Sequence, residues 1–198
     1  MTVIKDYTKI NEKFDERLEH MIDKHSKVTF FRYDVRFPND HPHNGKNDEF
    51  SEFQTRLKEQ LTRHGIENQN IWCREQKTSE NPHYHVAALV NGNLTQRVGG
   101  ILENAKNIWG NIIGSQEPGL INHCGSFNDQ NIPYQIRIDR PSSKKEGEKL
   151  LEQQAKFESK IKQVRKRAHY LGKDQQKGNV PKGVREYGAS ELPKVCKR

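Results

Sequence analysis

The sequence predicts an α+β fold in which helices pack against a mainly antiparallel sheet. Short stretches of alternating apolar and polar residues, typical of strands, are interspersed with longer stretches of helical apolar spacing. The composition is polar, with 31% hydrophobic and 30% charged residues among 198. That balance favours a single sheet covered by amphipathic helices over a large apolar interior.

The first third of the chain predicts a helix, a strand and a second helix. Apolar residues recur at helical spacing over 9–25, beginning with Ile10 and Phe14. The alternation of KVTFFRYDVRF predicts a strand over 27–37 with one buried face. Residues 38–48 are rich in Pro, Gly, Asn and Asp and predict a loop. Helical spacing returns over 49–64.

The middle of the chain predicts further strands around a helix. IWCREQ (71–76) and HYHVAALVN (83–91) are expected to be paired strands, which run antiparallel if residues 77–82 form the connecting loop. Residues 95–113 predict a helix that ends near Gly114. One or two short strands, LINHC and YQIRI, are expected within 119–139.

The C-terminal third predicts a long basic helix and a tail. Apolar residues alternate steps of four and three from Phe157 to Leu171, which predicts a core-facing helix over 144–173. We therefore expect an N-terminal helical extension over 1–26, a main domain over 27–173, and a tail over 174–198 that is flexible or ordered by a partner.

Charge and cysteine content narrow the class of function. Net charge is +8, and the region from Arg140 to the C-terminus carries 17 Lys and Arg against 7 Asp and Glu, which favours a nucleic-acid partner. No apolar run approaches the roughly 20 residues that cross a membrane, and the charged N-terminus lacks the apolar centre of a secretion signal. Cys73, Cys124 and Cys196 are widely spaced, so we expect a reducing cytoplasm rather than disulfides.

Two histidines stand at the start of the strand over 83–91. His83 and His85 share one face, because residues two apart on a strand point the same way, and both imidazoles can converge on one transition metal. Glu75 on the neighbouring strand joins them if residues of equal parity lie opposite each other. Structural histidines without metal and a zinc site that uses Cys73 are the alternatives.

A second His-x-His sequence serves as an internal comparison. His41-Pro-His43 lies in the predicted loop, where no strand holds the side chains parallel. We expect these two histidines to lie at the surface.

Tyr170 lies near the end of the predicted basic helix. Lys166, Lys173 and Lys177 fall on its helical face. A tyrosine hydroxyl has a pKa of about 10 and is a weak nucleophile unaided, but a nearby lysine can stabilise the phenolate and a metal can polarise a phosphodiester. The alternative is a partly packed tyrosine on a DNA-binding helix.

These motifs resemble those of a known family. His83-Tyr84-His85 resembles the His-hydrophobe-His motif of HUH endonucleases, and the run from Tyr170 to Lys173 resembles the Y-x-x-K motif of their single-tyrosine members. Over about 27–190 the chain is most similar to filamentous-phage and prophage replication proteins. The resemblance implies an RRM-like antiparallel sheet of about five strands.

The resemblance also implies a function. His83, His85 and Glu75 would hold Mn²⁺ or Mg²⁺, with Asp34 as the alternative third ligand. Tyr170 would attack single-stranded DNA at a replication origin or hairpin, leaving a 5′-phosphotyrosine and a 3′-OH that primes rolling-circle replication. Lys173 would assist at the phosphate. DNA contacts are expected from Lys166, Arg167, Lys177 and Arg32.

Partners and competing functions follow from the same resemblance. No G-x-x-x-x-G-K-[ST] run occurs, so a separate helicase is expected, together with the replication proteins of a bacterial host cell. A single-tyrosine transposase or a small relaxase would use the same chemistry. The alternative of another class is a non-catalytic module that binds single-stranded nucleic acid.

Overall fold

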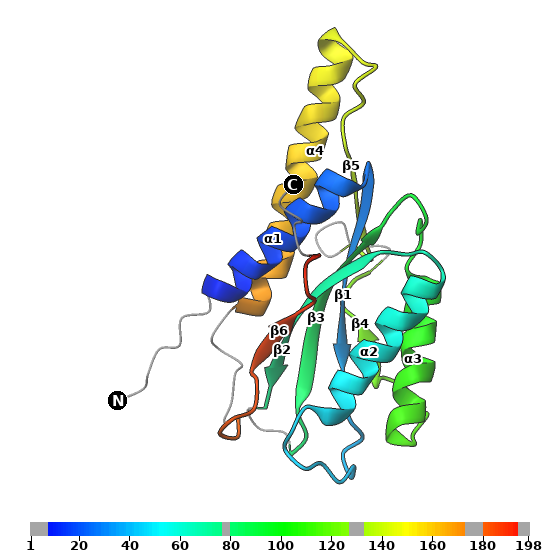
Figure 1. Cartoon of the computed structure of the whole chain (residues 1–198), viewed down its shortest axis with the longest axis vertical. Coiled ribbons are helices and arrows are strands. Elements are labelled where there is room, and N and C mark those ends of the chain that lie inside the picture. The colour runs from blue at the N-terminus through cyan, green and yellow to red at the C-terminus, as the bar shows by residue number, and fades with distance from the viewer. Residues whose placement is uncertain (1–7, 77–79, 127–132, 173–179, 194–198) are drawn as a thin grey trace.

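The computed structural model describes residues 8–76, 80–126, 133–172 and 180–193, and within them the chain forms a six-stranded antiparallel sheet with four α-helices (Figure 1). The helices are α1 (Thr8–Lys24), α2 (Asp48–Arg63), α3 (Gly99–Ile113) and α4 (Gly147–Ala168), followed by the 3-10 helix η1 (His169–Gly172). The strands are β1 (Lys27–Val35), β2 (Asn68–Glu75), β3 (His83–Asn91), β4 (Ile121–His123), β5 (Ile136–Asp139) and β6 (Tyr187–Ala189). The predicted α+β class is confirmed.

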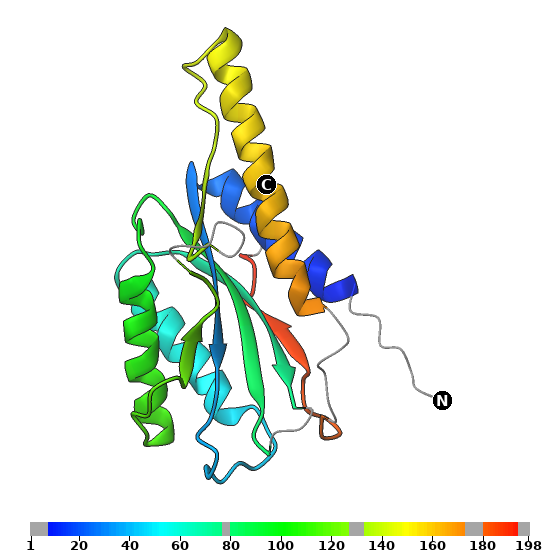
Figure 2. The same ribbon diagram turned by 180° about the vertical axis from the view of Figure 1, so that it is seen from behind.

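The sheet separates two layers of helices. Its strand order is β4-β1-β3-β2-β6, and β5 pairs with the first half of β1. The helices α2 and α3 cover one face, whereas α1 and α4 lie against the other (Figures 1 and 2). Within the described residues, no helix is both long and apolar enough to cross a membrane.

Strand β1 is buried on both faces, although the sequence predicted only one. Phe31 and Tyr33 pack under α2 and α3, while Phe30 packs under α1 and α4. The charged residues Arg32 and Asp34 share the face of Phe30. Their charges suggested an exposed face, but both side chains have polar partners in the structure, and a buried charge is tolerated when it is paired.

The long C-terminal helix ends earlier than the apolar pattern predicted. After Ala168 the chain tightens into η1, so Tyr170 lies on a 3-10 turn and not on α4. Gly172 allows this turn to approach α1, because a Cβ there would lie 2.7 Å from Asn11 Oδ1. The first half of α4 extends past the sheet, which leaves Phe157 only partly buried (Figure 1).

Both segments that the sequence set apart from the main domain contribute to the core. Helix α1 places Phe14 edge-on against Phe30 of β1. Strand β6 pairs with β2 at the sheet edge, and buried Arg17 of α1 donates to the Ser190 carbonyl. Within the tail expected over 174–198 to be flexible or ordered by a partner, residues 187–190 thus pack against the sheet and α1. A strand of three residues that contains a glycine has no detectable alternation, and only its pairing partner specifies it.

Glu67 ties α1 to the start of β2. Lys24, His20 and His25 each place a side-chain nitrogen 2.8–2.9 Å from its carboxylate. Burial alone would raise the pKa of Glu67, but the hydrogen bonds from these three residues outweigh it and lower the pKa to about 2. The charged carboxylate therefore contributes stability above its usual pKa, and the contribution is lost as pH falls towards 2.

Replacing Glu67 with glutamine should lower the free energy of unfolding by about 1 kcal/mol near pH 7. The difference between variant and wild type should persist above pH ~5 and shrink between pH ~4.5 and ~2. Urea unfolding at several pH values measures this. A difference that did not change with pH would contradict the assigned role of the carboxylate charge.

Candidate active site

Four polar side chains gather on the sheet face that α1 and α4 share. The pairing register sets Glu75 opposite His83, and Asp34 opposite His85. Strand alternation then places all four on the same face as Ala87, which is buried between the sheet and the helices α1 and α4. The antiparallel pairing of β2 and β3 is confirmed, and the equal-parity register that Glu75 required is present.

His85 links two carboxylates. Its Nδ1 lies 2.7 Å from Asp34 Oδ1, and its Nε2 lies 2.5 Å from Glu75 Oε2. Burial would lower the pKa of His85. The hydrogen bonds to Asp34 and Glu75, together with the negative charges of these two carboxylates, outweigh burial and raise the pKa. Burial would likewise raise the pKa of Asp34, but His85 and smaller contributions lower it. In this arrangement His85 carries both ring protons and donates to both acids.

His83 has the opposite electrostatic character. Burial lowers its pKa first, and the positive charge of Arg36 adds to this effect, so the imidazole is neutral and keeps a lone pair for coordination. His83, His85 and Glu75 are donors that fit a divalent transition cation. Among the described residues, however, no three His, Cys, Asp or Glu side chains are grouped as a ready metal site. The side chains are therefore of the types that bind a divalent cation, but in this structure His85, Asp34 and Glu75 form ion pairs with one another.

Tyr170 contacts Arg32, which lies on the same face of β1 as Asp34. The residue is 45% exposed, and the Arg32 guanidinium carbon lies 5.3 Å from the centre of its ring. Arg32 precedes Asp34 by two residues on β1 and shares its face. The structure thus brings the predicted tyrosine to the same sheet face as the histidine pair, with Arg32 between Tyr170 and Asp34.

The predicted basic contacts have different environments. Lys166 is exposed near the end of α4. Lys173 and Lys177 lie outside the described residues. Their expected position on the face of Tyr170 assumed a continuous α-helix, which η1 interrupts.

The Arg167 side chain binds backbone carbonyls within the domain. It is partly buried and donates to the carbonyls of Pro133 and Cys124. Its own carbonyl accepts a hydrogen bond from Arg32 Nη1 at 3.2 Å. Arg167 therefore holds the chain after β4 against the end of α4. DNA contact by Arg167 and Arg32 stays a prediction, and both guanidinium groups also hold backbone carbonyls of the domain.

Cys124 borders the site, and its environment favours the thiol over the thiolate that binds metals. Its Sγ lies 3.1 Å from Asp34 Oδ1. Burial and the negative charge of Asp34 raise the pKa of the thiol to about 12. A zinc-binding cysteine must lose its proton, and this environment favours the protonated thiol of Cys124. The zinc alternative that the sequence left open uses Cys73, and it stays open.

A comparison with known proteins gives the family of the chain. The family model described as the YagK/YfjJ C-terminal domain matches residues 3–190. The chain belongs to this family. No curated protein and no solved structure matched it. The matched range runs through α1 and β6, in agreement with their packing against the sheet.

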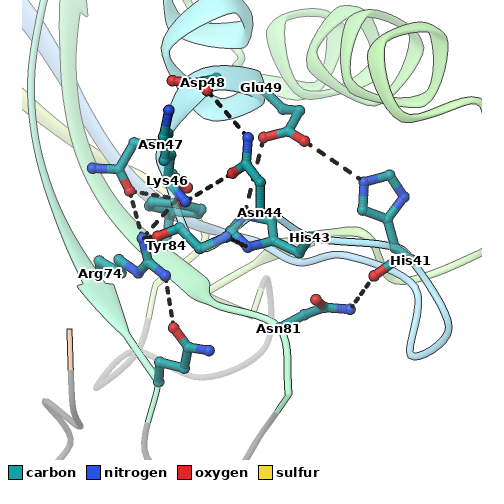
Figure 3. A network of polar contacts seen from close by, with 12 residues as sticks. His41, His43, Asn44, Lys46, Asn47, Asp48, Glu49, Arg74, Asn81 and Tyr84 are labelled. Atoms are coloured by element: carbon teal, nitrogen blue, oxygen red, sulfur yellow. Dashed lines mark hydrogen bonds and ion pairs between the residues drawn. The ribbon is translucent and has the colours of Figure 1, made fainter. Parts of the chain in front are cut away.

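In this YagK/YfjJ C-terminal domain, the second His-x-His sequence is not at the surface. The His43 side chain is only 3% exposed, and both His41 and His43 pack against the ring of Phe37. Their Nε2 atoms lie 3.9 and 4.0 Å from the carboxylate of Glu49 (Figure 3). His43 Nδ1 accepts from the Gly45 amide, so Nε2 of the neutral ring carries the proton. The prediction that these two histidines lie at the surface was wrong, because the composition of a loop does not show how its side chains pack.

Sequence reasoning also missed Arg74, which is fully buried under α2. It donates to the Gly45 carbonyl, to Asn47 Oδ1 and to Gln76 Oε1 (Figure 3). Tyr84 donates to the same Asn47 oxygen. The signal was available, since alternation along β2 puts Arg74 on the face opposite Glu75, which α2 covers.

Proposed function

We propose that this protein is a metal-dependent DNA nickase and strand transferase of the HUH type, with Tyr170 as its nucleophile. The observation that carries the proposal is the position of Tyr170. It lies over Arg32 on the sheet face that holds His83, His85 and Glu75. A binding module has no need for a tyrosine beside a histidine and carboxylate network.

The residues divide into ligands and a positioning group. His83, His85 through Nε2, and Glu75 would hold Mn²⁺ or Mg²⁺, and the ion would polarise the phosphodiester. A cation at His85 Nε2 would replace the proton that this nitrogen donates to Glu75. Asp34 accepts from Nδ1, the other ring nitrogen, so it orients the imidazole instead of binding the ion.

The reaction is a transesterification. Tyr170 Oη forms a bond to phosphorus while the bond from phosphorus to the 3′ oxygen breaks. The phenol loses one proton and the leaving oxygen gains one, so no nucleotide cofactor is consumed. Later attack of a 3′-OH on the 5′-phosphotyrosine reseals a strand and restores the tyrosine.

This chemistry suits the initiation of rolling-circle replication of a phage, prophage or satellite element in the cytoplasm of a bacterial host. The substrate would be a single-stranded origin or hairpin, unwound by a separate helicase with host replication proteins. A single-tyrosine transposase or small relaxase would make the same intermediate on a different element.

The test is a covalent adduct on a denaturing gel. The full chain is incubated with end-labelled single strands that carry candidate origin sequences, with Mn²⁺, with Mg²⁺, or with EDTA. We expect an adduct that needs a divalent ion and is lost in His83→Ala. An adduct of undiminished yield in EDTA would refute the metal dependence.

A second candidate function is a non-catalytic module for single-stranded nucleic acid. It is favoured by one observation: within the described ranges the ligand candidates form no ready metal site. Under this function, wild type and His83→Ala bind the strands equally and no strand yields an adduct.

The choice between Glu75 and Asp34 as third ligand gives a prediction that does not depend on DNA cleavage. Glu75→Gln should reduce Mn²⁺ affinity beyond detection. Asp34→Asn should reduce it by about 10- to 100-fold, the usual effect of losing a residue that orients a ligand. Calorimetric titration of the free protein measures both. The reverse order of effects would make Asp34 the ligand.

A further inference from the structure

A cavity of about 560 Å³ is lined by residues of α3, of β4 and of the segment between them. Figure 2 shows α3 beside β4 at this edge of the sheet. Its volume falls in the range of small-molecule sites, roughly 300–1,000 Å³. Its lining is rich in hydrogen-bonding side chains, including Asn107, Ser115, Gln116, Asn122, His123 and Tyr134. None of these residues takes part in the chemistry proposed above.

Two aromatic rings provide a flat wall. The rings of His123 and Tyr134 stack with centres 3.7 Å apart and planes 25° apart. Burial lowers the pKa of His123, which favours its neutral imidazole. Aromatic rings bind nucleobases by stacking, since every base offers a π face.

The charges around the cavity favour a base over a phosphate. Lys106 is the basic residue of the lining, and its ammonium lies 3.3 Å from Glu103, which also lines the cavity. Glu117 adds a second carboxylate. An uncharged base edge, read by amide side chains, fits this lining better than a phosphate anion.

The cavity and the candidate active site border the same strand, β4. Asn122 lies opposite Asp34, so it points to the active-site face, whereas His123 lies opposite Tyr33 and points to the other face. Both line the cavity. Cys124, the next residue, contacts Asp34 directly. We therefore expect a single strand held at the active site to pass close to this cavity.

We propose that the cavity binds one nucleobase of the single strand, next to the phosphate that Tyr170 attacks. This inference rests on the proposed function and deepens it, because the cavity would then select where the strand is cut. The base stacks on the His123–Tyr134 pair, and the amide side chains read its edge.

The test is a scan with abasic sites. The affinity of the full chain for a labelled single strand is measured by fluorescence anisotropy while one base at a time is removed. In wild type, removal of one particular base should weaken binding about tenfold. In Tyr134→Ala, removal of that base should have no further effect, whereas Tyr134→Phe keeps the ring and should behave as wild type. Lys149→Ala, on the exposed part of α4, is the matched control.

The outcomes separate the cavity from the chemistry. The inference is supported if removal of one base weakens binding in wild type and has no further effect in Tyr134→Ala; this dependence is called coupling below. If the same coupling is found in Tyr170→Phe, it concerns binding and not the covalent reaction. If every abasic strand weakens wild type and Tyr134→Ala equally, the cavity does not hold a base and the inference is overturned. An adduct without coupling overturns only the cavity, whereas coupling without any adduct supports the cavity and counts against the nickase.

Discussion

Replacing Tyr170 with phenylalanine is expected to lower the yield of covalent protein–DNA adduct at least about a thousandfold. The substitution removes only the hydroxyl, and the ring that packs over Arg32 remains. Folding should therefore be unchanged, because the side chain is 45% exposed and the cation–π contact does not need the oxygen. Denaturing gels with labelled single strands measure the adduct, and circular dichroism checks the fold.

Tyr187→Phe is the matched control for that experiment. Tyr187 is another partly buried tyrosine near the C-terminus, but it begins β6 and lies opposite Cys73 at the sheet edge. It should form the adduct as well as wild type does. If Tyr170→Phe retains the adduct and Tyr187→Phe loses it, the nucleophile is misassigned.

The sequence predicted the part of the site that depends on regular alternation. The shared face of His83 and His85 follows from strand periodicity alone, and β3 has the predicted bounds. The place of Glu75 also needed an equal-parity register, which the structure supplies. The end of α3 was also readable, because Gly114 adopts the left-handed conformation that commonly terminates a helix. Regular secondary structure makes side-chain direction predictable from position.

The remainder of the site depends on tertiary contacts that no local pattern encodes. Tyr170 left the predicted helix because η1 packs closely against α1 at Gly172. The sequence suggested that Asp34 is exposed, because its partners are distant in sequence. His85 lies on β3, and Cys124 directly follows β4. A buried charge looks like a surface charge in sequence until its partner is placed beside it.

Arg74 gives the largest stability effect that we predict. Arg74→Met should keep the apolar stem and lose every guanidinium hydrogen bond, which leaves the Gly45 carbonyl and Asn47 Oδ1 with fewer donors. Buried polar groups without partners cost roughly 1–3 kcal/mol each. The loss should therefore be about 3 kcal/mol in the free energy of unfolding, measured by urea denaturation.

The loss should begin in the loop that precedes α2 and extend to the active site. Asn81, just before His83, donates to the Pro38 carbonyl of the same loop at 2.8 Å. Amide exchange of that loop should therefore rise in Arg74→Met. Arg63→Met is the matched control: its side chain is 76% exposed at the end of α2, and the change should stay within about 0.5 kcal/mol. Equal effects of the two substitutions would mean that the buried guanidinium is replaceable by packing alone, and that the loop is held by its histidines and Glu49.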